Sequence, residues 1–387
     1  MISPAHLLHA SNTSALLDQL RDAPRIAIDT EFHTERTWLP ELFLVQLAFE
    51  DGTSWVVDPL DEPTFQAVGA AIAAVPTWVV HGGVQDLRVL SVALGRVADQ
   101  VFDTQIAAAL VTDQHPVGLG RLIQSMLGET LPKRATLSDW SRRPLSADQL
   151  RYAADDVTRL LPLWDHLDHL AAARGRCEIL RGACAEARTE ALRLLGPGEL
   201  LRDMGGTWHD PREAHLVAAL LAWREELGQR ENRPSRSLVG DQTLRQIARL
   251  APRHLDDFHD LRRVPRGFVK THGEAALGVI RRALDDGPDR WPRVVVPGTP
   301  AAGRALAMRL TLEAAGYLDQ YAAAFVVPGS LREALVLEPD PDAAPHLLTE
   351  WRARLAGGWI TQALTGSVTV SIRHGSIVAL EDPPQGK

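Results

Sequence analysis

Short apolar runs alternate with helix-like segments over the first part of the chain. Three such runs follow one another with no room for helices between them, which predicts an antiparallel meander: 25–29, 42–49 and 54–58. Two later runs, 77–81 and 100–103, alternate with helical patterns at 62–74 and 84–93. That alternation is typical of parallel βαβ units, so the whole segment predicts an α/β domain with a mixed sheet.

Helical periodicity dominates the rest of the first domain. We expect helices at 104–111 and 118–127 and a long helix that begins after Ser146. Gln149 stands three residues after Ser146, which is the signature of a capping box. The sequence therefore predicts a well-defined helix start at this point.

Two later stretches that contain Gly and Pro divide the chain into three parts. The part between these stretches has the pattern of four or five short helices, which predicts a small all-α bundle. The last segment is mainly helical, but two strand-like runs at 368–372 and 376–380 flank a turn and predict a terminal β-hairpin. The expected domains are 1–195, 208–286 and 298–387.

Composition supports several domains, because 387 residues are too many for one core. The net charge of −8 disfavours non-specific coating of nucleic acid, so any RNA contact must come from local basic patches. Cys177 and Cys184 lie seven residues apart in a helical segment, too far for a disulfide within one helix. Together with the lack of a signal peptide or an apolar membrane span, this predicts a cytoplasmic protein.

Two carboxylates stand at the end of the first strand. Asp29 and Glu31 are separated by one residue, so both side chains point to the same face of the strand. Their mutual repulsion costs stability, and a hard divalent cation between them would remove that cost. Acidic residues at strand ends also often just face water, so the pair by itself leaves both interpretations open.

Four further acids can be placed on predicted elements. Asp86 lies in the first turn of a helix, where the helix dipole favours an acid. Asp103 is expected to be the N-cap of the following helix. Tyr152 and Asp156 are four residues apart and share one helix face, whereas Asp155 is expected to face solvent or a cap partner.

The combination of these residues, in this order, resembles the ribonuclease D family, in the tyrosine-bearing branch of the DEDD exonucleases. The matching stretches run from about residue 20 to 165: 27–32, 45–48, 57–60, 81–87, 102–108, 139–145 and 152–157. The resemblance implies a ribonuclease-H-like fold. The helical bundle resembles the HRDC module, through 221–225, 234–236, 241–244 and 247–248. The final segment resembles ribonuclease D only loosely.

The resemblance implies a 3′→5′ exoribonuclease that trims transfer-RNA precursors and uses two divalent ions, Mg²⁺ or Mn²⁺. Two ions about 4 Å apart can hold the attacking water and the leaving oxygen on opposite sides of the phosphate. Asp29 would bridge both ions, Glu31 and Asp156 would hold one, and Asp86 would hold the other. Tyr152 would orient the attacking water by its hydroxyl; its reference pKa near 10 is high for a general base.

Two basic clusters are candidate RNA contacts, although each is also compatible with a merely solvated surface. The residues are Lys133, Arg134, Arg142, Arg143, Arg262, Arg263, Arg266, Phe268 and Lys270. The second cluster is expected to form a basic loop whose aromatic residue suits single-stranded RNA.

The sequence lacks the motifs of two other functional classes, dinucleotide enzymes and helicases. The first strand is not followed by the Gly-rich turn of a dinucleotide enzyme, and a Walker-type phosphate loop is missing. Two alternatives remain: a DNA 3′→5′ exonuclease of the same superfamily, and a non-catalytic RNA-binding scaffold. The second would require a lost carboxylate, and all four are present.

Overall fold

The computed structural model describes residues 6–112, 115–131, 139–193, 197–204, 208–261, 264, 266–314, 325–338, 344–365, 369–373 and 376–380. The chain divides into two compact units. The first contains 1–33, 40–193 and 318–325, and the second contains 34–39, 194–317 and 326–387. The predicted domains 208–286 and 298–387 both fall in the second unit, so their separation stays a prediction.

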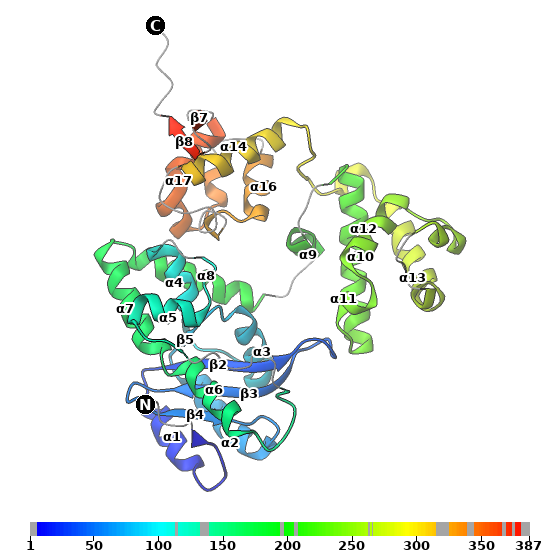
Figure 1. The fold of residues 1–387 in the computed structure, drawn as a ribbon. Coiled ribbons are helices and arrows are strands. Elements are labelled where there is room, and N and C mark those ends of the chain that lie inside the picture. The colour runs from blue at the N-terminus through cyan, green and yellow to red at the C-terminus, as the bar shows by residue number, and fades with distance from the viewer. Residues whose placement is uncertain are drawn as a thin grey trace. The chain divides into compact units, whose positions relative to one another are not determined.

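A six-stranded mixed sheet forms the centre of the first unit, in the order β1-β4-β3-β2-β5-β6 (Figure 1). Its strands are β1 (His6–Leu7), β2 (Arg25–His33), β3 (Glu41–Ala48), β4 (Ser54–Val57), β5 (Thr77–Val80) and β6 (Gln100–Asp103). β2, β3 and β4 pair antiparallel, whereas β5 pairs parallel with both β2 and β6. The predicted meander followed by parallel strands is therefore confirmed.

Helices cover both faces of this sheet. One face packs on α1 (Thr13–Asp22), α2 (Glu62–Ala74) and α3 (Val84–Leu94), whose Leu16, Ile72 and Leu90 are fully buried. On the other face, α6 (Ala147–Val157) packs on β2, β3 and β4 through its small residues Ala153 and Ala154. The remaining helices of this unit are α4 (Thr104–Val111), α5 (Leu119–Leu127), α7 (Leu160–Ala173) and α8 (Cys177–Ala191).

In this unit two elements were missed and one expectation was wrong. Sequence patterns did not reveal β1 and α1, which are short or carry few buried residues. The single long helix expected after Ser146 is instead three helices, α6, α7 and α8. One break lies at Gly175, whose φ of +63° ends a right-handed helix at little cost only for glycine.

The second unit begins with a helical bundle around its own core. Its elements are α9 (Pro197–Met204), α10 (Pro211–Glu231), α11 (Ser235–Leu238), α12 (Asp241–Leu250), η1 (Leu255–Asp260) and α13 (Arg266–Asp285). Gly273 lies within α13 and allows close packing, because a Cβ there would lie 2.7 Å from Leu255 Cδ2 of η1.

The C-terminal part of this unit is mainly helical. It contains η2 (Pro288–Arg290), α14 (Pro300–Ala314), α16 (Gly329–Leu337), η3 (Ala344–Leu347) and α17 (Glu350–Thr365). The predicted terminal hairpin is confirmed as the antiparallel pair β7 (Thr369–Arg373) and β8 (Ser376–Leu380). No helix within the described ranges is long and apolar enough to cross a membrane.

Candidate active site

β2 carries the first two carboxylates of the predicted site. Asp29 and Glu31 lie two residues apart on this strand and are both partly exposed. Burial and the charges of Asp86, Asp156 and Glu31 hold the pKa of Asp29 well above its usual range. Burial, followed by the charges of Asp156 and Asp86, raises the pKa of Glu31 to about 8. The protein thus gathers carboxylates whose like charges repel one another.

Asp86 reaches the site from the first turn of α3. It is 9% exposed, and burial raises the pKa of its carboxyl group. Its Oδ1 accepts a hydrogen bond from the Thr30 hydroxyl, and Thr30 stands between Asp29 and Glu31 on β2. This bond ties α3 directly to the strand that carries the other two acids.

Asp103 shapes the loop that leads into α3. Its carboxylate accepts hydrogen bonds from the backbone N–H groups of Gly82, at 2.9 Å, and Gly83, at 3.0 Å. The same side chain accepts from Gln105 N at 2.8 Å, so the expected N-cap of α4 is confirmed. A Cβ on Gly83 would lie 2.6 Å from Val80 Cβ, which leaves no space for a larger residue. Asp103 therefore fixes the backbone that places Asp86.

α6 supplies Tyr152 and Asp156. Its start is the predicted capping box, in which Ser146 and Gln149 each bond the other's backbone N–H. Burial raises the pKa of Asp156 to about 7, although the Tyr152 hydroxyl donates a hydrogen bond that opposes this shift. Burial and the charges of Asp156, Glu31 and Asp29 raise the pKa of Tyr152 far above 10. A base role for Tyr152 is therefore still less favourable than its reference pKa indicated.

Asp155 differs from its expected exposure. It is only 8% exposed, so it does not face solvent as the helix pattern had suggested. The charge of Asp155 contributes to the raised pKa of Asp156. The site therefore carries one more nearby acid than the sequence had indicated.

The donor set suits a hard cation. All four acids offer oxygen ligands, and each has a raised pKa because of burial or neighbouring negative charge. A divalent ion would neutralise that charge, as Mg²⁺ and Mn²⁺ do in oxygen-rich sites. Within the described ranges, however, no three Asp, Glu, His or Cys side chains are already arranged as a ready metal-binding group.

The basic residues of the first cluster have different environments. Arg142 is highly exposed and pairs with Asp139 at 2.9 Å. Arg143 is instead held inside the domain: its guanidinium binds the Asp58 carboxylate and donates to the carbonyl oxygens of Phe43 and Trp140. These partners occupy its donors, and its role as an RNA contact stays a prediction. Lys133 and Arg134 lie outside the described residues.

The described part of the second cluster lies on a helix. Arg262 and Arg263 lie outside the described residues, and Arg266 begins α13. Phe268 is 5% exposed and packs in the bundle core, and its RNA contact stays a prediction. Lys270 is exposed on the same helix. Only Lys270 therefore has a described side chain free to meet solvent in this cluster.

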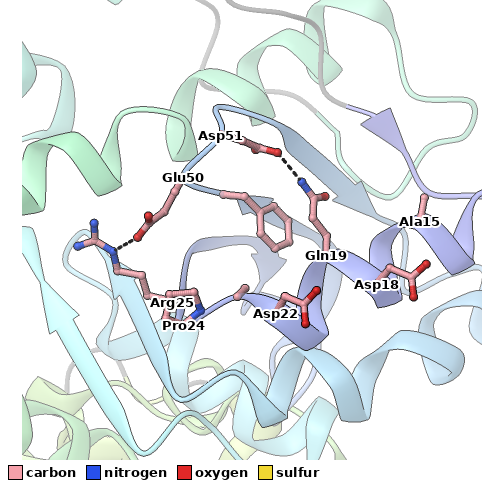
Figure 2. Close-up of a pocket in the computed structure, with 10 residues that line it drawn as sticks. Ala15, Asp18, Gln19, Asp22, Pro24, Arg25, Glu50 and Asp51 are labelled. Atoms are coloured by element: carbon pink, nitrogen blue, oxygen red, sulfur yellow. Dashed lines mark hydrogen bonds and ion pairs between the residues drawn. The ribbon is translucent and has the colours of Figure 1, made fainter.

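A surface cavity of about 430 Å³ in the first unit does not contain the site. It lies beside the start of β2, and Asp18, Asp22, Glu50 and Asp51 line it (Figure 2). None of the four proposed metal ligands lines this cavity. Several of its polar groups bind one another: Arg25 donates to Glu50 at 2.7 Å, and Gln19 donates to Asp51 at 3.0 Å (Figure 2).

Sequence reasoning missed two contributors to the site, Thr30 and the clamp of Asp103 on the glycine loop. The signal for Thr30 was a hydroxyl between two carboxylates on an otherwise apolar strand. The clamp had no sequence signal, because Asp103 and Gly82 are brought together only by the pairing of β5 with β6.

Comparison with known proteins is consistent with this geometry. Residues 7–171 match the family model of a 3′-5′ exonuclease, and residues 213–280 match that of the HRDC domain. Ribonuclease D of Gluconacetobacter diazotrophicus is 32% identical over 362 residues, which cover 92% of this chain and 91% of that protein. Ribonuclease D of Acidiphilium cryptum is 31% identical over 96% of this chain and 95% of that protein.

A solved structure shares the fold. The crystal structure of Escherichia coli RNase D superposes with a TM-score of 0.75 at 24% identity, covering 94% of this chain and 99% of that one. The order of the carboxylates, the two family models and the full-length relatives agree with one another. The chain belongs to the ribonuclease D family.

Proposed function

We propose that this chain hydrolyses RNA from its 3′ end and releases nucleoside 5′-monophosphates, with two Mg²⁺ or Mn²⁺ ions as cofactors. The observation that carries the proposal is the electrostatic cluster of Asp29, Glu31, Asp86 and Asp156 on β2, α3 and α6. A site that concentrates partly buried negative charge binds divalent cations well and apolar ligands poorly. Bound cations would activate the attacking water and neutralise charge on the leaving oxygen.

Each residue of the cluster has a proposed task. Asp29, Glu31, Asp86 and Asp156 would hold the ions through their carboxylate oxygens. Thr30, through its bond to Asp86, keeps that carboxylate from rotating away from β2. The Tyr152 hydroxyl stays protonated and would orient the attacking water, since its position beside Asp156 places it at the cluster.

The substrate class follows from the relatives. Full-length relatives are named ribonuclease D, and the Escherichia coli protein is described as an exoribonuclease involved in structured RNA processing. We infer that transfer-RNA precursors are substrates and that the HRDC module contributes RNA contacts. Both cysteines are free thiols, which supports a reducing, cytoplasmic location.

The test is a degradation assay with RNA labelled at its 5′ end. With Mg²⁺ or Mn²⁺, the labelled product should shorten progressively from the 3′ end, and chelation should stop the reaction. A DNA oligonucleotide of the same sequence and a 3′-phosphorylated RNA serve as comparisons. Faster degradation of DNA than of RNA would favour a DNA exonuclease, and RNA binding without any cleavage would favour a non-catalytic scaffold.

A further inference from the structure

Gln46 interrupts the apolar sequence of β3 beside the carboxylate cluster. It lies directly opposite Asp29 in the antiparallel pair of β2 and β3. Residues opposed in this way project to the same face of a sheet, with Cβ atoms about 5 Å apart. On its other side Gln46 is opposed by Val56 of β4, which lies in the core beneath Ala153 and Ala154 of α6. Gln46 thus shares a face with Asp29 and with the helix that carries Tyr152.

The carboxamide of Gln46 is fully buried without a partner. Its exposed fraction is 0%, and neither Oε1 nor Nε2 makes a hydrogen bond to any residue that the structure describes. A buried amide without partners is destabilising, whereas an apolar side chain of the same size would fill this place at no such cost. The stability of the fold therefore does not explain why a polar side chain stands at this position.

Asp29 stands opposite this amide, among the like charges of Asp86, Asp156 and Glu31. A buried water needs two to four polar partners. The Gln46 carboxamide offers one donor group and one acceptor, and the Asp29 carboxylate offers further acceptors. The two side chains together supply the partners that one ordered water requires.

We propose that Gln46 is a positioning residue that holds a water beside Asp29, in the coordination shell of the cation that Asp29 binds. The amide N–H of Gln46 donates to this water, and the water in turn orients the Asp29 carboxylate. Gln46 acts through Asp29 and does not touch RNA. This inference rests on the proposed metal-dependent function, and it adds a residue outside the four carboxylates and Tyr152.

The test replaces Gln46 with residues of similar size that cannot form hydrogen bonds. Gln46→Leu and Gln46→Met are both made in the full-length protein, so that one of them can be read if the other packs poorly. Gln66→Leu is the matched control, because Gln66 is an exposed residue of α2 that bonds only Glu62. Metal-free protein is used for thermal unfolding and for Mn²⁺ binding followed by electron paramagnetic resonance. RNA affinity and the single-turnover rate are measured separately.

We expect the Gln46 variants to unfold at the wild-type temperature or higher in the absence of metal, because an unpaired amide has been removed. Their Mn²⁺ dissociation constant should rise by about 10- to 100-fold, as is usual when a residue that supports a metal ligand is lost. The single-turnover rate should fall at fixed Mn²⁺, with RNA affinity unchanged. Gln66→Leu should match the wild type in all four measurements.

Two other outcomes are informative. If either Gln46 variant folds and binds Mn²⁺ as tightly as the wild type, with the same rate, Gln46 only fills space and the inference is overturned. If the wild type itself binds no Mn²⁺, the proposed metal-dependent function fails and the role of Gln46 fails with it. The two failures are therefore distinguishable.

Discussion

Glu31→Gln should stabilise the metal-free protein while it weakens the site for metal. Burial and the neighbouring acids raise the pKa of Glu31 from 4.5 to about 8. A carboxyl group with a raised pKa in the folded state favours folding fully below its unfolded pKa, and this contribution is lost as pH rises towards about 8. Since one pKa unit is worth 1.36 kcal/mol and pH 7 lies about 2.5 units above the unfolded pKa of 4.5, the ionisation of Glu31 in the unfolded chain lowers the free energy of unfolding by about 3 kcal/mol at pH 7.

Glutamine cannot ionise and escapes this cost. At pH 7 the variant should therefore gain up to about 3 kcal/mol, or roughly 6–12 °C in the unfolding temperature of a domain of this size. At pH 5 the gain should fall below about 1 kcal/mol, because this pH lies only about half a unit above the unfolded pKa of 4.5. Mn²⁺ at about 1,000 times the wild-type dissociation constant should reverse the order, since it stabilises the wild-type protein by about 4.1 kcal/mol.

Circular dichroism melting curves at pH 5 and pH 7, with chelator and with Mn²⁺, measure these differences. Glu35→Gln is the matched control, because Glu35 is an exposed carboxylate, and it should leave the melting temperature unchanged at both pH values. A Glu31→Gln variant that is less stable than the wild type at pH 7 without metal would refute the reasoning. So would a gain of equal size at both pH values.

Three further predictions concern catalysis and RNA binding. Asp29→Asn and Asp156→Asn should each abolish hydrolysis and leave the circular dichroism spectrum intact, and chelator should silence the wild type until Mg²⁺ or Mn²⁺ is added; full activity in either variant would contradict the metal assignment. Tyr152→Phe should slow single-turnover cleavage with little change in RNA affinity, whereas a loss of affinity alone would make Tyr152 a substrate contact. Arg143→Gln should lower the free energy of unfolding by about 3 kcal/mol, because it leaves the Asp58 carboxylate without its partner. Arg142→Gln should leave stability unchanged and reduce the salt slope of RNA binding by about 0.7. Equal salt slopes for the wild type and Arg142→Gln would show that Arg142 does not contact RNA.

Local patterns carried most of the secondary structure. The runs that became β2 to β6, and the capping box at Ser146, depend on interactions between residues a few positions apart, which sequence shows directly. Patterns failed where packing decides the outcome. Asp155 was expected to face solvent or a cap partner, but α6 packs on the sheet and Asp155 is only 8% exposed.

The basic and aromatic residues show the same division. Arg143 and Phe268 were reasonable RNA contacts by residue type, yet Arg143 binds Asp58, 85 positions earlier in the chain, and Phe268 is buried in the bundle core. Residue type states what a side chain is able to do. Burial and long-range partners decide whether it is available to do it.

The sequence by itself determined the family, the order of the four carboxylates and their local placement. Asp29 and Glu31 share a strand face, and Tyr152 and Asp156 share a helix face, because these spacings follow from the periods of strand and helix. Only the tertiary structure decided how these acids affect one another. The pairing of β2 with β3 and β5 and the packing of α6 bring distant charges into a partly buried site. The pKa values of these acids rise because long-range packing removes water from groups that are far apart in the chain. The pairing of β2 with β3 also places the buried Gln46 opposite Asp29.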